Sequence, residues 1–180
     1  MKVMESALQH LPEGVLTGKD VVKGEKRLKD AAFFEDKSGV DENTLLYTVY
    51  SMSDGEGLNW GLTVLEPVVV NGQYNMTRGH FHENLDAQEY YWCMSGNGFL
   101  LLMDEEGNTW AEVVKPGSLH RINGHHAHRL INTGEGQLKV AACWPADAGH
   151  DYVRVEKMPF GDICMKAEGG PKWLTTNSRP

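Results

Sequence analysis

The chain has 180 residues, of which 41% are hydrophobic, and its formal net charge of −8 argues against nucleic acid as a partner. No stretch approaches the roughly 18 consecutive apolar residues that a membrane helix needs, which excludes a membrane as a partner. Three widely spaced cysteines and an N-terminus without an apolar signal core favour a cytoplasmic protein with reduced thiols.

Short strands separated by turns dominate the predicted structure. A short helix is predicted at residues 26–35, ahead of a core at about residues 40–160 of a single domain that spans residues 1–180. The predicted strands are residues 45–52, 60–66, 73–82, 88–94, 98–103, 109–114, 127–132 and 137–144. Glycine-rich and asparagine-rich turn sequences lie between them.

About eight short strands with little helix are typical of an all-β fold, here a two-sheet jelly roll or cupin, which is a double-stranded β-helix barrel. Residues 1–40 and the tail after Phe160 are expected to form short extensions. They wrap the barrel or build a subunit interface.

Two histidines and a glutamate form a candidate metal site. His80 and His82 share one face of a predicted strand, because side chains two apart in a strand point the same way. Glu89 follows in the next strand, and His128 lies in A-H-R-L-I-N at residues 127–132. Three imidazoles and one carboxylate suit Fe, Mn, Ni, Co or Zn. Four ligands on an octahedral ion leave two positions open, as a catalytic site requires.

The alternative is that these histidines are surface residues or hydrogen-bonded core residues. That reading is preferred for His10, His120 and His125. His126 has the same strand parity as His128, but we assign it no role.

Two motifs resemble those of the cupin superfamily. They are G-H-F-H-x6-E-x6-G at residues 79–96 and P-G-x10-H-x3-N at residues 116–132. W-P-A-D-A-G-H-D-Y at residues 144–152, with L-Y-T-V-Y at residues 46–50, makes the similarity more specific. Over roughly residues 17–160 the sequence resembles the cupin-type glucose-6-phosphate isomerases.

The resemblance implies a metal-dependent aldose–ketose isomerase of glycolysis and gluconeogenesis. Its substrate would be a sugar phosphate, glucose 6-phosphate or fructose 6-phosphate, and the protein would be a homodimer. Each subunit would hold one divalent metal, Fe(II) or Mn(II) in preference to Ni(II), Co(II) or Zn(II). The implied metal ligands are His80, His82, Glu89 and His128.

The cation would polarise O1 and O2 of the open-chain sugar. Glu89 would be a ligand and also the candidate base that moves a proton between C2 and C1. A metal-assisted hydride shift, with Glu89 as a ligand only, is the rival route, and the sequence leaves both open.

The resemblance also implies a phosphate pocket and two further catalytic residues. The substrate-binding residues would be Tyr47, Thr63, Thr77, Gly79, Tyr91 and Tyr152. Gly79 suits close approach of a phosphate to the backbone, because it has no side chain. Tyr91 would hydrogen-bond the sugar, and His150 would donate to the sugar or assist ring opening. For any single Tyr or Thr the alternative is ordinary packing.

Strand parity disagrees with one of these assignments. It places Arg78, rather than Thr77, on the face of His80 and His82. A loop or bulge before His80 would reconcile the two, and without one Arg78 is the better phosphate partner.

Two positions depart from the family pattern. Trp144 stands where family members have a tyrosine, and Asn123-Gly124 stands where the pattern prefers prolines. The indole changes the pocket wall, while neither departure removes a metal ligand.

Three other functions fit parts of the pattern. One is an isomerase or epimerase of another phosphosugar such as mannose 6-phosphate. The others are an Fe-dependent oxygenase and a non-catalytic sugar-binding cupin.

Overall fold

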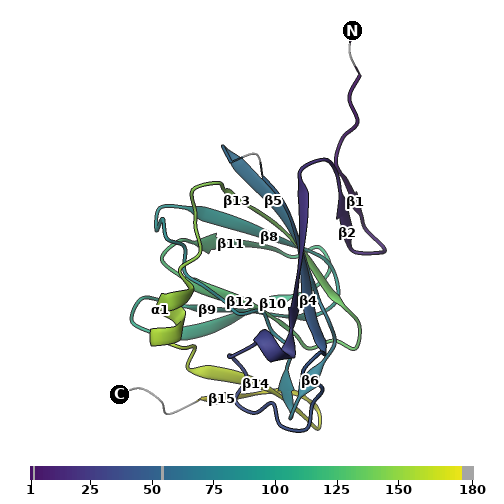
Figure 1. Cartoon of the computed structure of the whole chain (residues 1–180). Coiled ribbons are helices and arrows are strands. Elements are labelled where there is room, and N and C mark those ends of the chain that lie inside the picture. The colour runs from purple at the N-terminus through teal and green to yellow at the C-terminus, as the bar shows by residue number, and fades with distance from the viewer. Residues whose placement is uncertain (2, 54, 176–180) are drawn as a thin grey trace.

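The computed structural model describes residue 1, residues 3–53 and residues 55–175, and strands make up most of its regular structure (Figure 1). Helical structure in these residues is limited to the 3-10 turn η1 (Leu28–Asp30) and the helix α1 (Tyr152–Lys157). The strands are β1 (Leu8–His10), β2 (Val15–Thr17), β3 (Val21–Arg27), β4 (Leu45–Met52), β5 (Leu58–Leu65), β6 (Val69–Val70), β7 (Gln73–Tyr74), β8 (Gln88–Ser95), β9 (Gly98–Met103), β10 (Thr109–Val114), β11 (Leu119–Asn123), β12 (Ala127–Asn132), β13 (Leu138–Pro145), β14 (Asp162–Ala167) and β15 (Gly170–Thr175).

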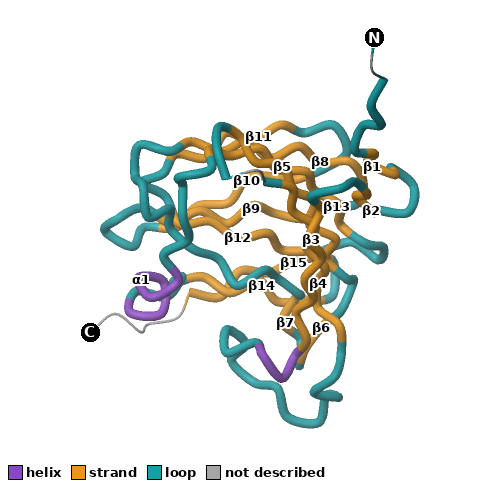
Figure 2. The backbone as a smooth tube through the Cα atoms, turned by 45° about the horizontal axis from the view of Figure 1, so that its top comes forward, coloured by secondary structure: helices purple, strands orange, loops and turns teal. Residues whose placement is uncertain are grey.

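The strands form two layers with the core between them. One layer is a six-stranded sheet in the order β11-β8-β13-β5-β4-β3, and all its pairings are antiparallel. The other layer contains the three-stranded sheet β10-β9-β12. The strands β14 and β15 lie on the side of this sheet that is away from β8, β11 and β13 (Figures 1 and 2). Single bridges from Met76 to Ile131 and from His80 to His128 attach residues 76–80 to the free edge of β12. The predicted all-β fold with little helix is confirmed.

Apolar side chains from both layers fill the core, and β9 and β12 bury consecutive residues. Its largest fully buried members include Phe81, Leu100, Met103, Leu130 and Leu138. These residues come from both layers, so burial of their apolar surface holds the sheets together. The core fixes the backbone on which the polar residues near residues 80–91 stand.

The predicted strand at residues 73–82 is wrong beyond Tyr74. Only β7 is a ladder strand, and the rest is extended chain joined by isolated bridges. Gly79 has φ +78°, a left-handed conformation that breaks the alternation of side chains. The parity argument for residues 77–82 therefore does not hold across Gly79.

The predicted helix at residues 26–35 is also wrong. Lys26 and Arg27 pair with β4 as the end of β3, and only the turn η1 is helical. Ala31 and Phe34 are buried in the core, so tertiary packing outweighs the helical pattern of this segment.

The terminal extensions add strands at three places. β3 extends the edge of the six-stranded sheet, and the β14–β15 hairpin pairs with β7 through Met165 and Gln73. The β1–β2 hairpin is held by the indole of Trp60, which donates to the Gln9 side-chain oxygen at 2.6 Å. No helix in the described part of the chain is long and apolar enough to cross a membrane.

Candidate metal centre and substrate cavity

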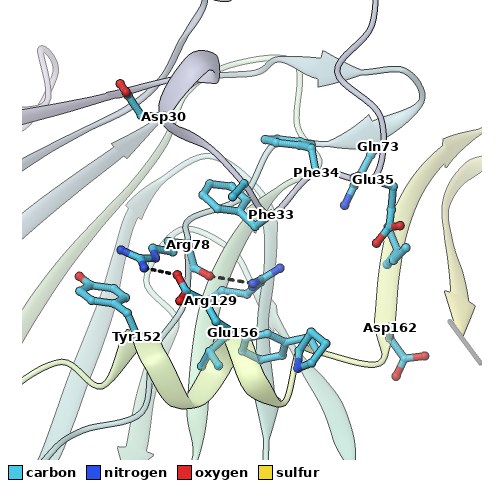
Figure 3. Close-up of a pocket in the computed structure, with 15 residues that line it drawn as sticks. Asp30, Phe33, Phe34, Glu35, Gln73, Arg78, Arg129, Tyr152, Glu156 and Asp162 are labelled. Atoms are coloured by element: carbon cyan, nitrogen blue, oxygen red, sulfur yellow. Dashed lines mark hydrogen bonds and ion pairs between the residues drawn. The ribbon is translucent and has the colours of Figure 1, made fainter. Parts of the chain in front are cut away.

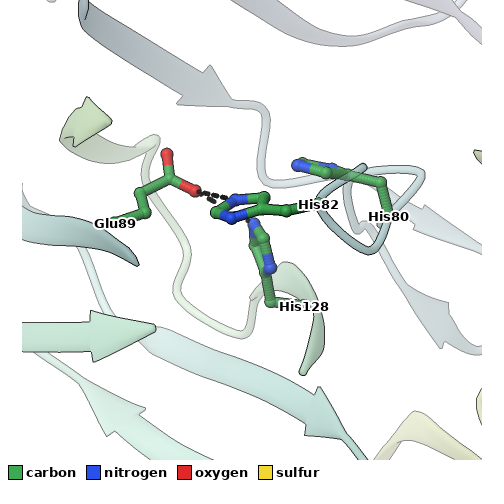
Figure 4. A group of neighbouring side chains, drawn as sticks. All are labelled: His80, His82, Glu89 and His128. Carbon is green, nitrogen blue, oxygen red and sulfur yellow. Dashed lines mark hydrogen bonds and ion pairs between the residues drawn. The ribbon is translucent and has the colours of Figure 1, made fainter. Parts of the chain in front are cut away.

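Four side chains from three parts of the chain converge at one point (Figure 4). One possible ligand atom from each of His80, His82, Glu89 and His128 lies within 4.8 Å of all the others. His80 and His82 come from the extended segment after β7, Glu89 is the second residue of β8, and His128 is the second residue of β12. The bridge between His80 and His128 holds two of these segments side by side.

Backbone carbonyls orient two of the imidazoles. His82 Nδ1 lies 3.3 Å from the carbonyl oxygen of Ala87, and His128 Nδ1 lies 3.3 Å from that of His126. A carbonyl only accepts hydrogen bonds, so each Nδ1 carries the proton and each Nε2 presents a lone pair. The Nε2 atoms of His82 and His128 face Glu89 Oε2 at 3.3 Å and 3.2 Å.

This arrangement fits a divalent cation. His128 Nε2 is buried and has no hydrogen-bond partner among the described residues. Lone pairs that face a carboxylate oxygen without a donor between them are unfavourable in a buried place, and a cation removes that conflict. Neutral imidazoles oriented by carbonyls through Nδ1 are typical of metal sites.

Electrostatics keep the donors in the protonation states that a metal needs. Burial lowers the pKa of His80 well below its ordinary value, and His128 and His150 lower it further, so the imidazole is neutral. Burial by itself would raise the pKa of Glu89. A proton or a cation between its Oε2 and the Nε2 atoms of His128 and His82 outweighs that effect and lowers the pKa of Glu89.

The four side chains lie beside a cavity of about 350 Å³ between the two layers. β4, β5, β8 and β13 of the six-stranded sheet form one wall, and residues 77–80 with His128 form the other. Every site residue predicted from the sequence lines this cavity except His82, which is buried behind it. The predicted residues on its wall are Tyr47, Thr63, Thr77, Gly79, His80, Glu89, Tyr91, His128, His150 and Tyr152.

Aromatic rings surround the metal cluster on the cavity side. The His80 ring centroid lies 4.4 Å from that of His150 and 5.6 Å from that of Tyr152. The Tyr91 ring lies 5.7 Å from that of His128. Burial raises the pKa of Tyr91 well above its ordinary value and that of Tyr47 to about 12, so both hydroxyls remain protonated donors at neutral pH.

Thr77 and Arg78 both line the cavity, which the strand parity did not predict. The loop before His80 contains the left-handed Gly79, and it brings both residues to the same wall. The Thr77 hydroxyl accepts from the Leu130 N–H at 3.0 Å and keeps its own proton to donate. Arg78 Nη2 donates to Glu156 Oε1 at 2.6 Å.

Glycine is required at position 79 for reasons beyond its conformation. A Cβ atom there would lie 2.9 Å from Phe160 Cε2 and 3.1 Å from Arg129 Nε. The backbone of Gly79 therefore packs closely against the side chains of Phe160 and Arg129 on one side, and its other side faces the substrate cavity.

The other histidines lie outside the cluster. His10 contacts the Thr17 hydroxyl at 3.0 Å, His120 contacts Glu112 at 2.6 Å, and His125 contacts Glu105 at 2.8 Å. The His126 ring packs edge-on against Trp110, with ring centroids 4.8 Å apart, and does not line the cavity.

The sequence reasoning missed part of the cavity wall. Val49 and Ser51 line it beside Tyr47, and their spacing of two along β4 was the available signal. Trp144 lines the cavity, as expected from the sequence, and its six-membered ring lies 2.8 Å from where a Cβ of Gly61 would be. The indole therefore occupies space that only a glycine at position 61 leaves open.

Comparisons with known proteins identify the family of the chain. The family model described as glucose-6-phosphate isomerase (GPI) matches residues 27–178. The chain belongs to this family. Glucose-6-phosphate isomerase of Thermococcus litoralis is 35% identical over 166 residues, which cover 84% of this chain and 87% of the relative. That of Pyrococcus furiosus is 34% identical over 141 residues, covering 73% and 75% of the two chains. The prediction of a cupin-type glucose-6-phosphate isomerase is confirmed at the level of the family.

Solved structures also match the chain, at lower similarity. Oxalate decarboxylase of Bacillus subtilis aligns with a TM-score of 0.48 and 18% identity, over 58% of this chain and 26% of that one. An oxalate oxidase in complex with glycolate aligns with a TM-score of 0.47 and 14% identity, over 77% and 58%.

Proposed function

We propose that the chain interconverts glucose 6-phosphate and fructose 6-phosphate, using one divalent cation held by His80, His82, Glu89 and His128. The observation that carries the proposal is the convergence of these four donors beside a cavity that also has several hydroxyl groups on its wall. The names of the relatives support the choice of substrate. Fe(II) and Mn(II) are the preferred cations, because the mixed nitrogen and oxygen donor set suits them.

The bound cation supplies Lewis acidity toward the sugar oxygens. Glu89 then moves the proton: its carboxylate takes the proton from C2 and returns it to C1, while the hydroxyl proton passes from O2 to O1. Oε2 of Glu89 faces His82 and His128, whereas the other carboxylate oxygen points away from both imidazoles (Figure 4). A carboxylate with one oxygen still free favours the proton-transfer route over the hydride shift.

The phosphate group binds against the loop that contains Gly79, on the side that faces the substrate cavity. Tyr47, Thr63, Thr77 and Tyr152 offer hydroxyl donors on this part of the cavity wall. Hydroxyls, a backbone N–H and a guanidinium provide the directed donors that a dianion requires in a chain of negative net charge. Arg78 adds a positive charge to the same wall, so we propose that it binds the phosphate together with Thr77.

Tyr91 and His150 act on the sugar itself. Tyr91 is half-buried beside the proposed metal ligands with its hydroxyl protonated, so it donates to a sugar oxygen. His150 packs against His80, and burial lowers its pKa, so it is neutral and able to accept a proton during ring opening.

A coupled assay tests the function. Protein stripped by chelator and reloaded with Mn(II) or Fe(II) is given fructose 6-phosphate, and glucose 6-phosphate is followed by its oxidation with a dehydrogenase. We expect turnover that depends on metal and persists with Mn(II) under anaerobic conditions, which an oxygenase would not show. Mannose 6-phosphate is supplied in a parallel reaction, and faster turnover of that sugar would assign a different substrate.

A reloaded protein that turns over no phosphosugar would contradict the proposal and favour a binding module. The single domain of residues 1–180, the homodimer and the cytoplasmic location stay predictions of the sequence.

A further inference from the structure

A second and larger cavity, of about 550 Å³, lies behind the loop that carries Thr77 and Arg78 (Figure 3). Its wall is built from the segment after η1, from α1 and from the start of β14. It shares Arg78 and Tyr152 with the substrate cavity but none of the proposed metal ligands. Its volume lies within the range of about 300–1,000 Å³ that is typical of small-molecule sites.

A buried positive charge without a counter-ion lies in the wall of this cavity. Arg129 is only 8% exposed, and no carboxylate of the described residues forms an ion pair with it. Its Nη2 donates to the Arg78 carbonyl oxygen at 2.7 Å, and Nη1 contacts the Met76 sulfur at 3.0 Å. Its Nε has no hydrogen-bond partner among the described residues. Burying a guanidinium with only neutral acceptors is costly unless an anion also contacts it.

Aromatic rings flank this guanidinium. Its central carbon lies 4.2 Å from the centroid of the Phe160 ring and 5.8 Å from that of Phe33. Phe34 lies next to Phe33, with ring centroids 5.3 Å apart. A cavity with several rings and a cation that has no carboxylate partner favours a ligand that has an anionic head and a flat apolar body.

Four carboxylates also line the cavity, but each is either exposed to water or already has a polar partner, unlike the buried Arg129. Glu156 is neutralised by Arg78, and Asp162 accepts hydrogen bonds from Thr109 and Thr175. The remaining two, Asp30 and Glu35, are exposed, so water screens their charge. Arg129 is buried and is screened far less, and its pKa of about 9, lowered by burial, still leaves it charged at neutral pH.

We propose that this cavity is a binding site for an organic anion with an aromatic or similarly flat body, whose carboxylate or phosphate contacts Arg129 and whose body packs against Phe33 and Phe160. The site is separate from the metal centre and does not depend on the isomerase reaction. Arg129 donates to the backbone of Arg78 and lies against Gly79, so the ligand would sit directly behind the loop proposed to bind the substrate phosphate.

Ligand-observed fluorine NMR on the metal-loaded full chain tests the site. The probes are 4-fluorobenzoate, 4-fluorophenyl phosphate and the neutral 4-fluorobenzamide. Sorbitol 6-phosphate, a non-isomerisable sugar phosphate, is present at saturation so that the substrate cavity is filled. We expect at least one anionic probe to bind saturably and about tenfold or more tightly than the amide, because the contact with Arg129 is charge-assisted.

Two variants separate the head and body contacts. Arg129→Met removes the charge, and Arg121→Met removes an exposed arginine of β11 as the matched control. Phe33→Ala removes a half-buried ring and leaves the guanidinium in place. We expect Arg129→Met to abolish the preference for the anions, Phe33→Ala to weaken all probes, and Arg121→Met to change nothing.

Three results would overturn the proposal: equal binding of the anions and the amide, anion binding that is seen only when sorbitol 6-phosphate is left out, or unchanged anion binding in Phe33→Ala. Circular dichroism shows whether Arg129→Met is folded. Where it is not, the amide comparison and Phe33→Ala decide the question by themselves.

Discussion

Arg78 is stacked over the face of Tyr152, with its guanidinium carbon 4.1 Å from the ring centroid. The same side chain forms an ion pair with Glu156 at 2.6 Å. Both contacts hold the guanidinium at the boundary between the substrate cavity and the second cavity. A short movement of this side chain would carry its charge toward a bound phosphate.

Replacement of Arg78 by methionine is expected to raise KM for fructose 6-phosphate about tenfold and to change kcat much less. The reason is that a contact with the unreacting phosphate stabilises the ground state and the transition state equally. Steady-state kinetics check this prediction, with Arg121→Met as the control for loss of an exposed arginine. A fall in kcat with an unchanged KM would show that Arg78 does not bind the phosphate.

Replacement of Glu156 by glutamine is expected to leave KM unchanged or to lower it. This change removes the competing carboxylate, whose side chain is 60% exposed and whose ion pair contributes little to stability. A KM that rises as much as in Arg78→Met would mean that the ion pair itself positions Arg78.

Replacement of His82 or His128 by alanine is expected to abolish metal retention and to lower turnover about 100-fold or more, because each removes one of four donors. Elemental analysis of the purified protein, paired with the coupled assay, measures both effects. His125→Ala is the matched control, because His125 is an exposed histidine that contacts Glu105. Variants that keep both metal and full rate would show that the site is assigned to the wrong residues.

Replacement of Gly79 by alanine is expected to lower the free energy of unfolding by more than the same change at Gly39. Both glycines have positive φ, +78° and +71°. A Cβ at position 39 meets nothing within 4 Å, whereas at position 79 it meets Phe160 and Arg129. Backbone strain alone costs about 1–2 kcal/mol. Denaturant unfolding measures the difference, and equal losses at the two positions would show that the close contacts cost nothing.

Replacement of Gly61 by alanine tests the role of Trp144 in the cavity wall. The new Cβ would lie 2.8 Å from two atoms of the indole, so we expect lower turnover and stability. The shorter ring in Trp144→Tyr relieves that contact, so the double variant should lose less than the sum of the two single variants. Additive losses would place the indole away from position 61.

Much of the sheet structure could be predicted because the strands alternate or form short apolar runs. The predicted bounds at residues 98–103, 109–114 and 127–132 coincide with β9, β10 and β12. β11 was missed because His120 occupies a buried position, so the pattern of Leu119–Asn123 does not read as alternation of apolar and polar residues. The Asp151 side chain that accepts from Arg154 N at 2.9 Å was an available signal for the start of α1.

The clustering of His80, His82 and Glu89 could be predicted from their spacing, but the geometry behind that prediction was partly wrong. The first two histidines were placed on a regular strand, whereas Gly79 and isolated bridges position them. The second cavity could not be predicted, since its wall joins residues from Asp30 to Ile163 that only the folded chain brings together. A lone arginine in a strand gives no sign in the sequence that it is buried without a carboxylate.

The most direct test of the account is a titration of chelator-treated protein with Mn(II), in which bound metal and the rate of glucose 6-phosphate formation are measured on the same samples. The account predicts that the rate rises in proportion to bound metal and that both reach their limit at one ion per chain, with neither seen in the His128→Ala variant. Full turnover by protein that contains no metal would contradict it.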